Sequence, residues 1–146
     1  MKVLDVNLLL YALDASSPRH ELARPWLERT MSGPDTVGLP WTTLLAFLRL
    51  STRSAVFTAP LSGDQALNVI DEWLSLPPVV VVHPGRRHAA VLREMLSSVG
   101  TAGNLVPDAH LAALAVEHGA ELCSCDADFS RFPGVRWVDP LREAPG

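Results

Sequence analysis

Short apolar runs alternate with amphipathic stretches along the chain. Runs rich in Val, Leu and Ile that are too brief for a helix predict strands, and apolar residues at helical spacing predict helices between them. This alternation is typical of an α/β domain with a mostly parallel central sheet flanked by helices. The predicted strands are residues 3–6, 37–39, 79–82, 122–125 and 135–138. The predicted helices are residues 7–13, 18–30, 41–50, 64–76, 86–99 and 108–118.

Proline, glycine and aspartate set the expected element ends. Pro18 is expected to open the second helix, whose apolar face includes Leu22, and Asp64 to cap the fourth helix at its N-terminus. The glycine-containing segment 100–104 is expected to end the fifth helix. Four consecutive valines, residues 79–82, predict a strand buried on both faces.

Length and composition limit the class of protein. A chain of 146 residues, 48% of them hydrophobic, fits one compact domain: a core of about residues 1–141 and a short C-terminal tail. No apolar run approaches the roughly 20 residues of a membrane span, and the chain enters a strand pattern at once instead of a signal sequence. We therefore expect a cytoplasmic protein. Cys123 and Cys125 share one predicted strand and are expected to be reduced core residues.

The net charge of −4 argues against a broad basic surface for nucleic acid. Two features weaken that argument. Eleven of the twelve cationic residues are arginine, whose planar fork suits phosphate. Several of the sixteen acidic residues also stand where a bound divalent cation would offset their charge.

Four aspartates stand at the ends of apolar runs: Asp5, Asp108, Asp126 and Asp128. Open α/β sheets place ligands in the crevice beyond the carboxyl ends of their strands. Mg²⁺ and Mn²⁺ prefer oxygen ligands, and two-metal nucleases hold such ions roughly 3.5 to 4 Å apart. Taken singly, each aspartate is better explained by an ordinary structural role: a helix cap, an Asx turn or a strand end. As a set at three separate termini they favour a metal site.

Three segments, in this order, resemble the motifs of PIN-domain ribonucleases, in particular the VapC toxins of bacterial toxin–antitoxin pairs. Residues 4–12 read LDVNLLLYA, residues 107–115 read PDAHLAALA, and residues 124–129 read SCDADF and are followed by RFPG. The lead-in NLVPD, residues 104–108, is similar to that of actinobacterial members. The family commonly has Thr at the place of Ser124. The resemblance implies a PIN-like fold over nearly the whole chain.

The resemblance also implies roles for individual residues. Asp5, Asp108 and Asp126 would be the catalytic residues that hold Mg²⁺ or Mn²⁺, and Asp128 would be an outer metal ligand. Two polar residues would orient carboxylates or water, although a turn and a strand hydroxyl are equally good interpretations: Asn7 and Ser124.

The implied function is metal-dependent endoribonuclease activity, as the VapC toxin of a toxin–antitoxin pair. The expected partners are an RNA substrate, a cognate VapB-type antitoxin and a second copy of the chain. Two arginine groups are candidate RNA contacts, with ordinary solvated faces as the alternative: Arg49 and Arg53, and Arg86 and Arg87. Some apolar side chains could form a partner face instead of core: Trp26, Leu44, Leu45, Phe47, Leu48 and Trp73.

One departure from the family pattern keeps other functions open. Many PIN domains carry a glutamate on the helix after the second strand, but residues 41–49 contain no acid, and the expected position falls at Phe47. A degenerate PIN domain that binds RNA or a protein without cleavage is therefore one alternative. A housekeeping RNA-processing nuclease is another. His110 lies about 200° around the helix from Asp108, so it is expected to be a surface or partner-contact residue.

Overall fold

The computed structural model describes residues 1–100 and 103–142. Within them, five strands are β1 (Lys2–Leu4), β2 (Val37–Leu39), β3 (Val79–Val81), β4 (Glu121–Cys123) and β5 (Arg136–Val138). The α-helices are α1 (Val6–Leu13), α2 (His20–Met31), α3 (Trp41–Ser51), α4 (Gly63–Ser75), α5 (His88–Val99) and α6 (Val106–Glu117). Two short 3₁₀ helices are η1 (Gly103–Leu105) and η2 (Ala127–Arg131).

The strands form one sheet in the order β3-β2-β1-β4-β5, and every neighbouring pair is parallel. The predicted mostly parallel α/β fold is confirmed. The chain builds outward from β1 through β2 to β3, then crosses back to place β4 on the other side of β1. The order therefore reverses between β1 and β4, and such a switch point is where open α/β sheets form their ligand crevice.

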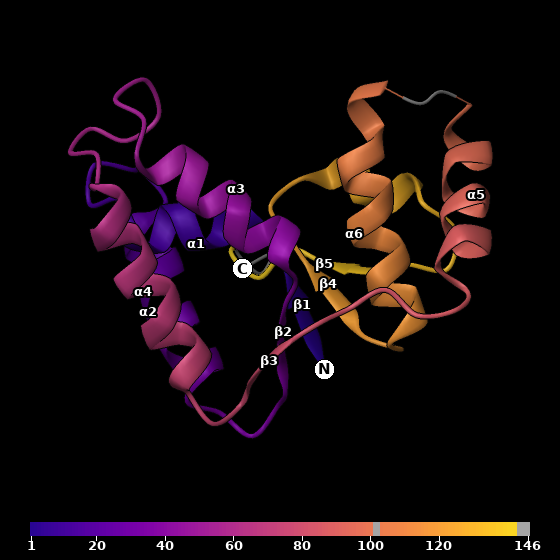
Figure 1. Ribbon diagram of the computed structural model, residues 1–146, viewed down its shortest axis with the longest axis horizontal. Coiled ribbons are helices and arrows are strands. Elements are labelled where there is room, and N and C mark those ends of the chain that lie inside the picture. Colours follow the sequence, from indigo (N-terminus) through magenta and orange to yellow (C-terminus); the bar gives the residue numbers. More distant parts are fainter. Residues whose placement is uncertain (101–102, 143–146) are drawn as a thin grey trace.

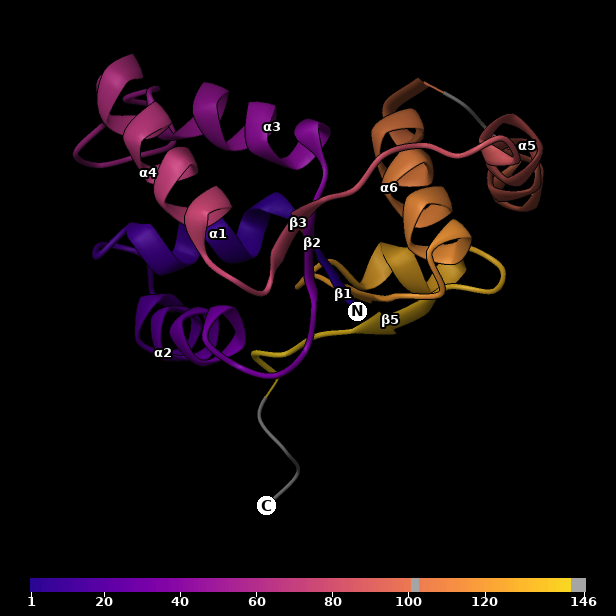
Figure 2. The same ribbon diagram turned by 60° about the horizontal axis from the view of Figure 1, so that its bottom comes forward.

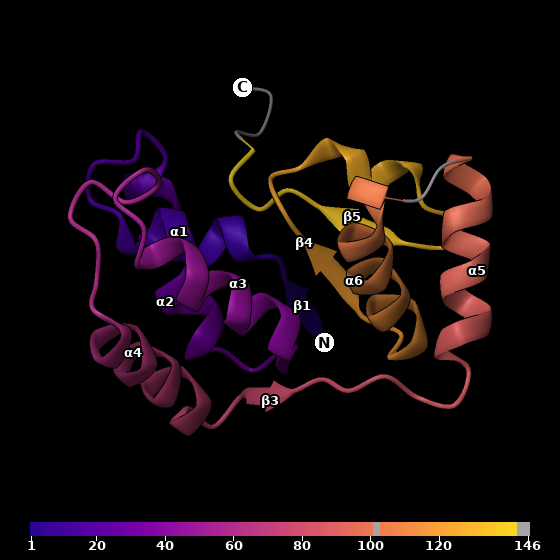
Figure 3. The same ribbon diagram turned by 45° about the horizontal axis from the view of Figure 1, so that its top comes forward.

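Helices cover both faces of this sheet. Figures 1 and 2 show α1 to α4 gathered on one side of the strands and α5 with α6 on the other. Neighbouring residues of β1 serve the two sides, because side chains alternate along a strand. Leu4 belongs to the core cluster built with α1 to α4, and Val3 to the cluster built with α5 and α6. Figure 3 shows the long connection from β3 to α5 that joins the two halves.

Capping side chains decide where two helices begin. Asp5 caps α1 through its side chain, so β1 stops at Leu4 and Val6 is already helical, whereas the sequence predicted a strand through Val6. Ser62 caps α4, and with Gln65 it forms a reciprocal capping box that satisfies two backbone N–H groups. The prediction of Asp64 as the cap was wrong.

Other boundaries differ by a few residues. α2 begins at His20 instead of Pro18, and Leu22 is exposed because it points away from the core cluster. The prediction that the four-valine strand is buried on both faces was wrong, because β3 is an edge strand and Val80 is exposed. Gly100 ends α5 in the left-handed conformation at φ 74°, as predicted, because glycine lacks the Cβ that opposes it.

Two expectations fall partly outside the described residues: the rest of the 100–104 segment at residues 101–102, and the C-terminal tail at residues 143–146. Among the described residues, no helix is both long and apolar enough to cross a membrane.

Candidate carboxylate site at the carboxyl edge of the sheet

Asp5 lies where β1 ends and α1 begins. Its backbone N–H donates to the Cys123 carbonyl at 3.0 Å, which continues the pairing of β1 with β4. Its side-chain Oδ1 accepts the Val6 N–H at 2.8 Å and so caps α1. The strand end and the helix start thus hold the Asp5 carboxylate at the switch point.

Ser124 follows β4, and its hydroxyl is fully buried. Ser124 Oγ donates to Asp5 Oδ2 at 2.7 Å. The same oxygen accepts from Asn7 Nδ2 at 3.1 Å and from the Asp126 N–H at 3.0 Å. Trp137 Nε1 on β5 donates to the Ser124 carbonyl at 2.9 Å, a contact that sequence reasoning missed. One hydroxyl therefore ties the ends of two neighbouring strands together.

Asn7 completes this connection from the first turn of α1. Its Nδ2 also donates to Asp5 Oδ2 at 3.3 Å, and its Oδ1 accepts the Cys125 N–H at 3.4 Å. The structure thus brings Asn7 and Ser124 against Asp5, where the sequence predicted them. Because Ser124 and Cys125 lie beyond the end of β4, the predicted strand 122–125 was two residues too long at this end.

Asp126 and Asp128 lie in the turn after β4. Asp126 Oδ1 accepts the Asp128 N–H at 2.9 Å and caps η2. Asp126 is partly buried, whereas Asp128 is exposed. The pair therefore makes the Asx turn of the conservative interpretation and also places its charge near Asp108, whose pKa it affects.

Asp108 lies in the first turn of α6. That helix begins at Val106, two residues earlier than predicted, with Pro107 in its first turn. Asp108 is partly buried, while Leu111 and Ala112 on the same helix are core residues. The carboxylate is thus carried on a rigid, well-packed helix.

Electrostatics show that these carboxylates crowd one another. Burial, as the larger cause, and the negative charges of Asp5, Asp126 and Asp128 together raise the pKa of Asp108 to about 6. Burial also raises the pKa of Asp5, although hydrogen bonds from Ser124 and Val6 oppose the shift. Carboxylates whose pKa is raised by burial and by neighbouring negative charge are candidates for a functional site.

The candidate ligand atoms have the chemistry that a hard divalent cation prefers. Their positions in this structure do not have the geometry to hold one. All candidate donors are carboxylate oxygens, which Mg²⁺ and Mn²⁺ prefer. Within residues 1–100 and 103–142, no group of three or more His, Cys, Asp or Glu has the arrangement to hold a metal ion as it stands. Mutual repulsion between Asp108 and the other carboxylates opposes close approach, so we expect small side-chain rotations to accompany ion binding.

Ser124→Ala is expected to lower the affinity for Mn²⁺ and the rate of any cleavage by about 10- to 100-fold, because the supporting hydrogen bond to Asp5 is lost. Ser124→Thr retains the hydroxyl and should stay close to the parent protein. Calorimetric titration with Mn²⁺ measures the effect. Equal affinities for the Ala and Thr variants would show that the hydroxyl does not support the site.

Phe47 occupies the position where the family glutamate was expected. Its side chain is fully buried and meets Trp73 of α4 edge to face, with ring centroids 4.7 Å apart. One turn earlier, Thr43 Oγ1 donates to the Leu4 carbonyl at 3.0 Å and holds α3 against the end of β1. The α3 helix thus contributes packing and a backbone contact near the site, but no acid.

The four candidate RNA-contact arginines are not brought to the carboxylates by any ion pair in the described part of the chain. All are exposed: Arg49, Arg53, Arg86 and Arg87. Their contact with RNA stays a prediction.

Most of the apolar side chains considered for a partner face belong to the core. Leu44, Phe47 and Trp73 are buried, and Trp26 and Leu48 pack partly buried against the same cluster. For these the core interpretation is correct, because they lie on the sides of α2, α3 and α4 that pack against the core cluster. Leu45 is different: it is 54% exposed, and Trp41, one turn earlier on α3, is 45% exposed.

His110, expected to be a surface or partner-contact residue, lies only partly at the surface, and its contact with a partner stays a prediction. Its ring is half-buried between α5 and α6, and its Nδ1 lies 2.8 Å from Nε2 of His88. Burial is the main cause that lowers the pKa of His110. Only the packing of α5 on α6 could reveal this pair, since 22 residues separate the two histidines.

The structure is a parallel α/β domain whose strand order reverses between β1 and β4. The carboxylates that follow β1 and β4 lie near this reversal, together with one from α6. These features define a class of α/β domains with an acidic site. The family comparison agrees with that class: residues 2–135 match the PIN domain model. This chain belongs to the PIN domain family.

Individual proteins of the family are similar to this chain over nearly its whole length. The chain is 50% identical over 140 residues to Ribonuclease VapC37 of Mycobacterium tuberculosis, covering 96% of this chain and 97% of that one. It is 41% identical over 143 residues to Ribonuclease VapC33 of the same species, covering 98% and 100%. The fold is also that of Mycobacterium tuberculosis VapC20, a sarcin-ricin loop cleaving toxin, with TM-score 0.67, 22% identity and coverage of 93% and 99%.

Proposed function

We propose that this protein is an endoribonuclease that uses Mg²⁺ or Mn²⁺ and acts in the cytoplasm as the toxin of a VapBC-type pair. The observation that carries the proposal is the gathering of Asp5, Asp108 and Asp126 at the switch point, where burial and like charge raise the pKa of two of them. The full-length similarity to proteins named VapC ribonucleases supports the reaction class.

In this proposal the carboxylates hold the ion and position the reacting groups. Asp5, Asp108 and Asp126 would be its ligands, with Asp128 as an outer member. A bound Mg²⁺ or Mn²⁺ would lower the pKa of water and offset charge on the phosphate. Ser124 and Asn7 fix the rotation of Asp5 through its Oδ2 atom. No protein nucleophile would be required, because an ion held by these carboxylates would supply activated water as the nucleophile.

The proposed partners follow from the same relatives. Solved structures with this fold include VapBC2 from Rickettsia felis, bound to a promoter DNA fragment (TM-score 0.68, 18% identity, 94% of this chain and 96% of that one). By likeness to it, we propose a VapB-type antitoxin as partner, together with RNA as substrate and a homodimer as the assembly. Exposed Trp41 and Leu45 on α3 offer apolar surface for one of these protein contacts.

The test is cleavage of total cellular RNA by the purified, antitoxin-free protein in Mn²⁺, in Mg²⁺ and in EDTA. We expect discrete cuts with either metal and none in EDTA, because the carboxylates alone cannot lower the pKa of water. Cuts that persist in EDTA would instead indicate a metal-independent or contaminating nuclease and contradict the proposal.

A second candidate is a PIN domain that binds RNA or a protein without cutting. The buried Phe47 in place of an acid favours it, because one fewer carboxylate weakens the hold on a second ion. RNA binding without cleavage at any metal concentration would support this alternative.

A further inference from the structure

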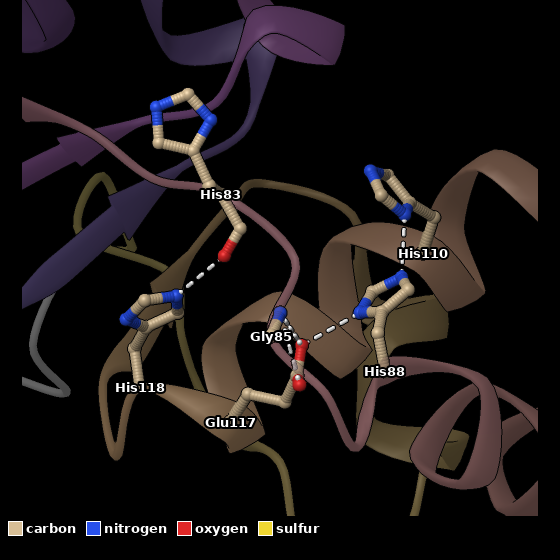
Figure 4. Close-up of polar contacts among 6 residues, drawn as sticks. All are labelled: His83, Gly85, His88, His110, Glu117 and His118. Atoms are coloured by element: carbon tan, nitrogen blue, oxygen red, sulfur yellow. Dashed lines mark hydrogen bonds and ion pairs between the residues drawn. The ribbon is translucent and has the colours of Figure 1, made fainter.

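A line of three polar side chains joins α5 to α6 away from the carboxylate site. Figure 4 shows Glu117, His88 and His110 connected in that order. His88 Nδ1 lies 2.7 Å from Glu117 Oε2, and His88 Nε2 lies 2.8 Å from His110 Nδ1. The side chains of His88 and Glu117 are only 14% and 8% exposed. The carboxylate of Glu117 is further held by the Gly85 N–H at 3.2 Å.

The positions of the protons along this line follow from which groups can donate and which can accept hydrogen bonds. An ionised carboxylate only accepts hydrogen bonds, so the Nδ1–H of His88 donates to Glu117. In the neutral ring the other nitrogen, Nε2, then carries a lone pair. His110 Nδ1–H must therefore donate to His88 Nε2, and one proton occupies the space between the two ring nitrogens. The lone pair of His110 sits on its Nε2.

We propose that His88 Nε2 and His110 Nδ1 form a two-histidine site for Zn²⁺ or a similar imidazole-preferring ion. A histidine ligand nearly always donates its other N–H to a carboxylate, a backbone carbonyl or water, which fixes the ring and raises the basicity of the ligand nitrogen. Glu117 already stands in that relation to His88. The lone pair so prepared points at a second imidazole from a different helix.

The geometry needs only a small adjustment. With Zn–N bonds of 2.0 to 2.1 Å, two ligands of a tetrahedral ion lie about 3.3 Å apart. The two nitrogens here are 2.8 Å apart, and the rings meet edge to face at 78°. If the two nitrogens move roughly 0.5 Å further apart and the His110 ring rotates, the ion fits between them. The proton on His110 Nδ1 leaves, and a proton is taken up at His110 Nε2, so the ring remains neutral.

Solvent would complete the coordination. No third His, Cys, Asp or Glu among the described residues has ligand geometry with this pair. The other two histidines in Figure 4 are engaged differently, since His118 Nε2 contacts the His83 carbonyl at 2.9 Å. The site therefore has two protein ligands and open positions for water.

This site would select different ions from the carboxylate site. Imidazole nitrogen suits Zn²⁺, Ni²⁺ and Cu²⁺, whereas Mg²⁺ and Mn²⁺ favour carboxylate and water. Because its ligands lie on separate helices, an ion here would bridge α5 to α6, the helix that carries Asp108. Such an ion binds the folded chain in preference to the unfolded one, so it would stabilise the fold.

The experiment is a calorimetric titration of untagged protein with ZnCl₂, in the Asp108→Asn background so that the carboxylate site contributes less. We expect one Zn²⁺ per chain, with affinity at least about 10-fold weaker for Glu117→Gln and weaker still for His110→Ala and His88→Ala. The matched control, His118→Ala, removes a histidine from the same helix end and should leave the affinity unchanged.

Thermal unfolding with Zn²⁺ and with Mg²⁺ provides a second readout. Zn²⁺ should raise the Tm of the Asp108→Asn protein but not that of its His110→Ala derivative, and Mg²⁺ should raise neither. His110→Ala is decisive if His88→Ala fails to fold, because its ring is only half-buried. Absent Zn²⁺ binding, or binding unchanged by His110→Ala, or binding equally lost in His118→Ala, would each overturn the proposal. None of these results depends on RNA cleavage.

Discussion

Asp108→Asn is expected to reduce metal-dependent RNA cleavage by about 100-fold or more while making the metal-free protein more stable. Loss of a ligand removes more than loss of a supporting contact, for which 10- to 100-fold is typical. The gain in stability has an electrostatic cause. The Asp108 carboxylate is partly buried and faces the charges of Asp5, Asp126 and Asp128, so asparagine relieves desolvation and repulsion together.

The pH dependence of stability follows from the sign of the pKa shift. The pKa of Asp108 in the folded protein is about 6, above its ordinary value of 3.8. Between those values the folded state binds more protons than the unfolded state, so the free energy of unfolding falls as pH rises. The loss continues through pH 6 and levels off about one pH unit above it. In EDTA, the Tm advantage of Asp108→Asn should therefore grow from pH 4 to pH 7 and then level off.

Added Mn²⁺ should make the parent protein more stable than Asp108→Asn, which reverses the order expected in EDTA. An ion that binds only the folded state stabilises the parent protein, and Asp108→Asn should gain much less. Thermal unfolding in EDTA and in Mn²⁺, beside cleavage assays, measures both effects. Asp71→Asn, an exposed aspartate on α4, is the matched control and should change neither. An Asp108→Asn protein that cleaves RNA normally, or that is less stable than the parent in EDTA, would contradict this account of the site.

Phe47→Glu, which restores the acid expected from the family pattern, is expected to unfold the protein instead of completing a second metal site. Phe47 is fully buried against Trp73. The substitution removes an aromatic core side chain and buries a carboxylate without a partner, at a cost of more than about 4 kcal/mol. That is a large part of the total stability of a typical domain.

Thermal unfolding followed by circular dichroism measures this effect. We expect the Tm to fall by more than roughly 10 °C, or the folded signal to be lost. Phe47→Leu keeps an apolar side chain and should cost only about 1 to 2 kcal/mol. A folded Phe47→Glu protein with increased cleavage would falsify this interpretation, because the side chain would then have to reach the carboxylates from α3.

Local patterns predicted most elements because they depend on neighbours in the sequence. The helix at 41–50 was placed within one residue from its apolar spacing, and the end of α5 from the glycine-containing segment 100–104. The start of a helix was predicted wrongly where two neighbouring side chains could both cap it. Ser62 and Asp64 are both good caps, and Ser62 prevails because Gln65 completes a reciprocal pair with it.

The candidate site was predictable as a set of residues and not as a geometry. Apolar runs that end in aspartate indicated the carboxyl edge, and the motif resemblance grouped Asp5, Asp108 and Asp126. The hydroxyl of Ser124 as the link between β1 and β4 depends on their pairing across 119 residues. Sequence gives no distance for such a pair.

The sequence by itself determined the α/β class, the strand and helix order and the identity of the acidic residues, because periodicity and caps act over a few neighbouring positions. Only the tertiary structure decided which residues face one another. It placed Val80 at a sheet edge and enclosed Phe47 between helices. It also joined His88 to His110 and raised the pKa of Asp108. Each of these depends on burial and on charges brought together from distant segments, which the packing of helices on a sheet creates.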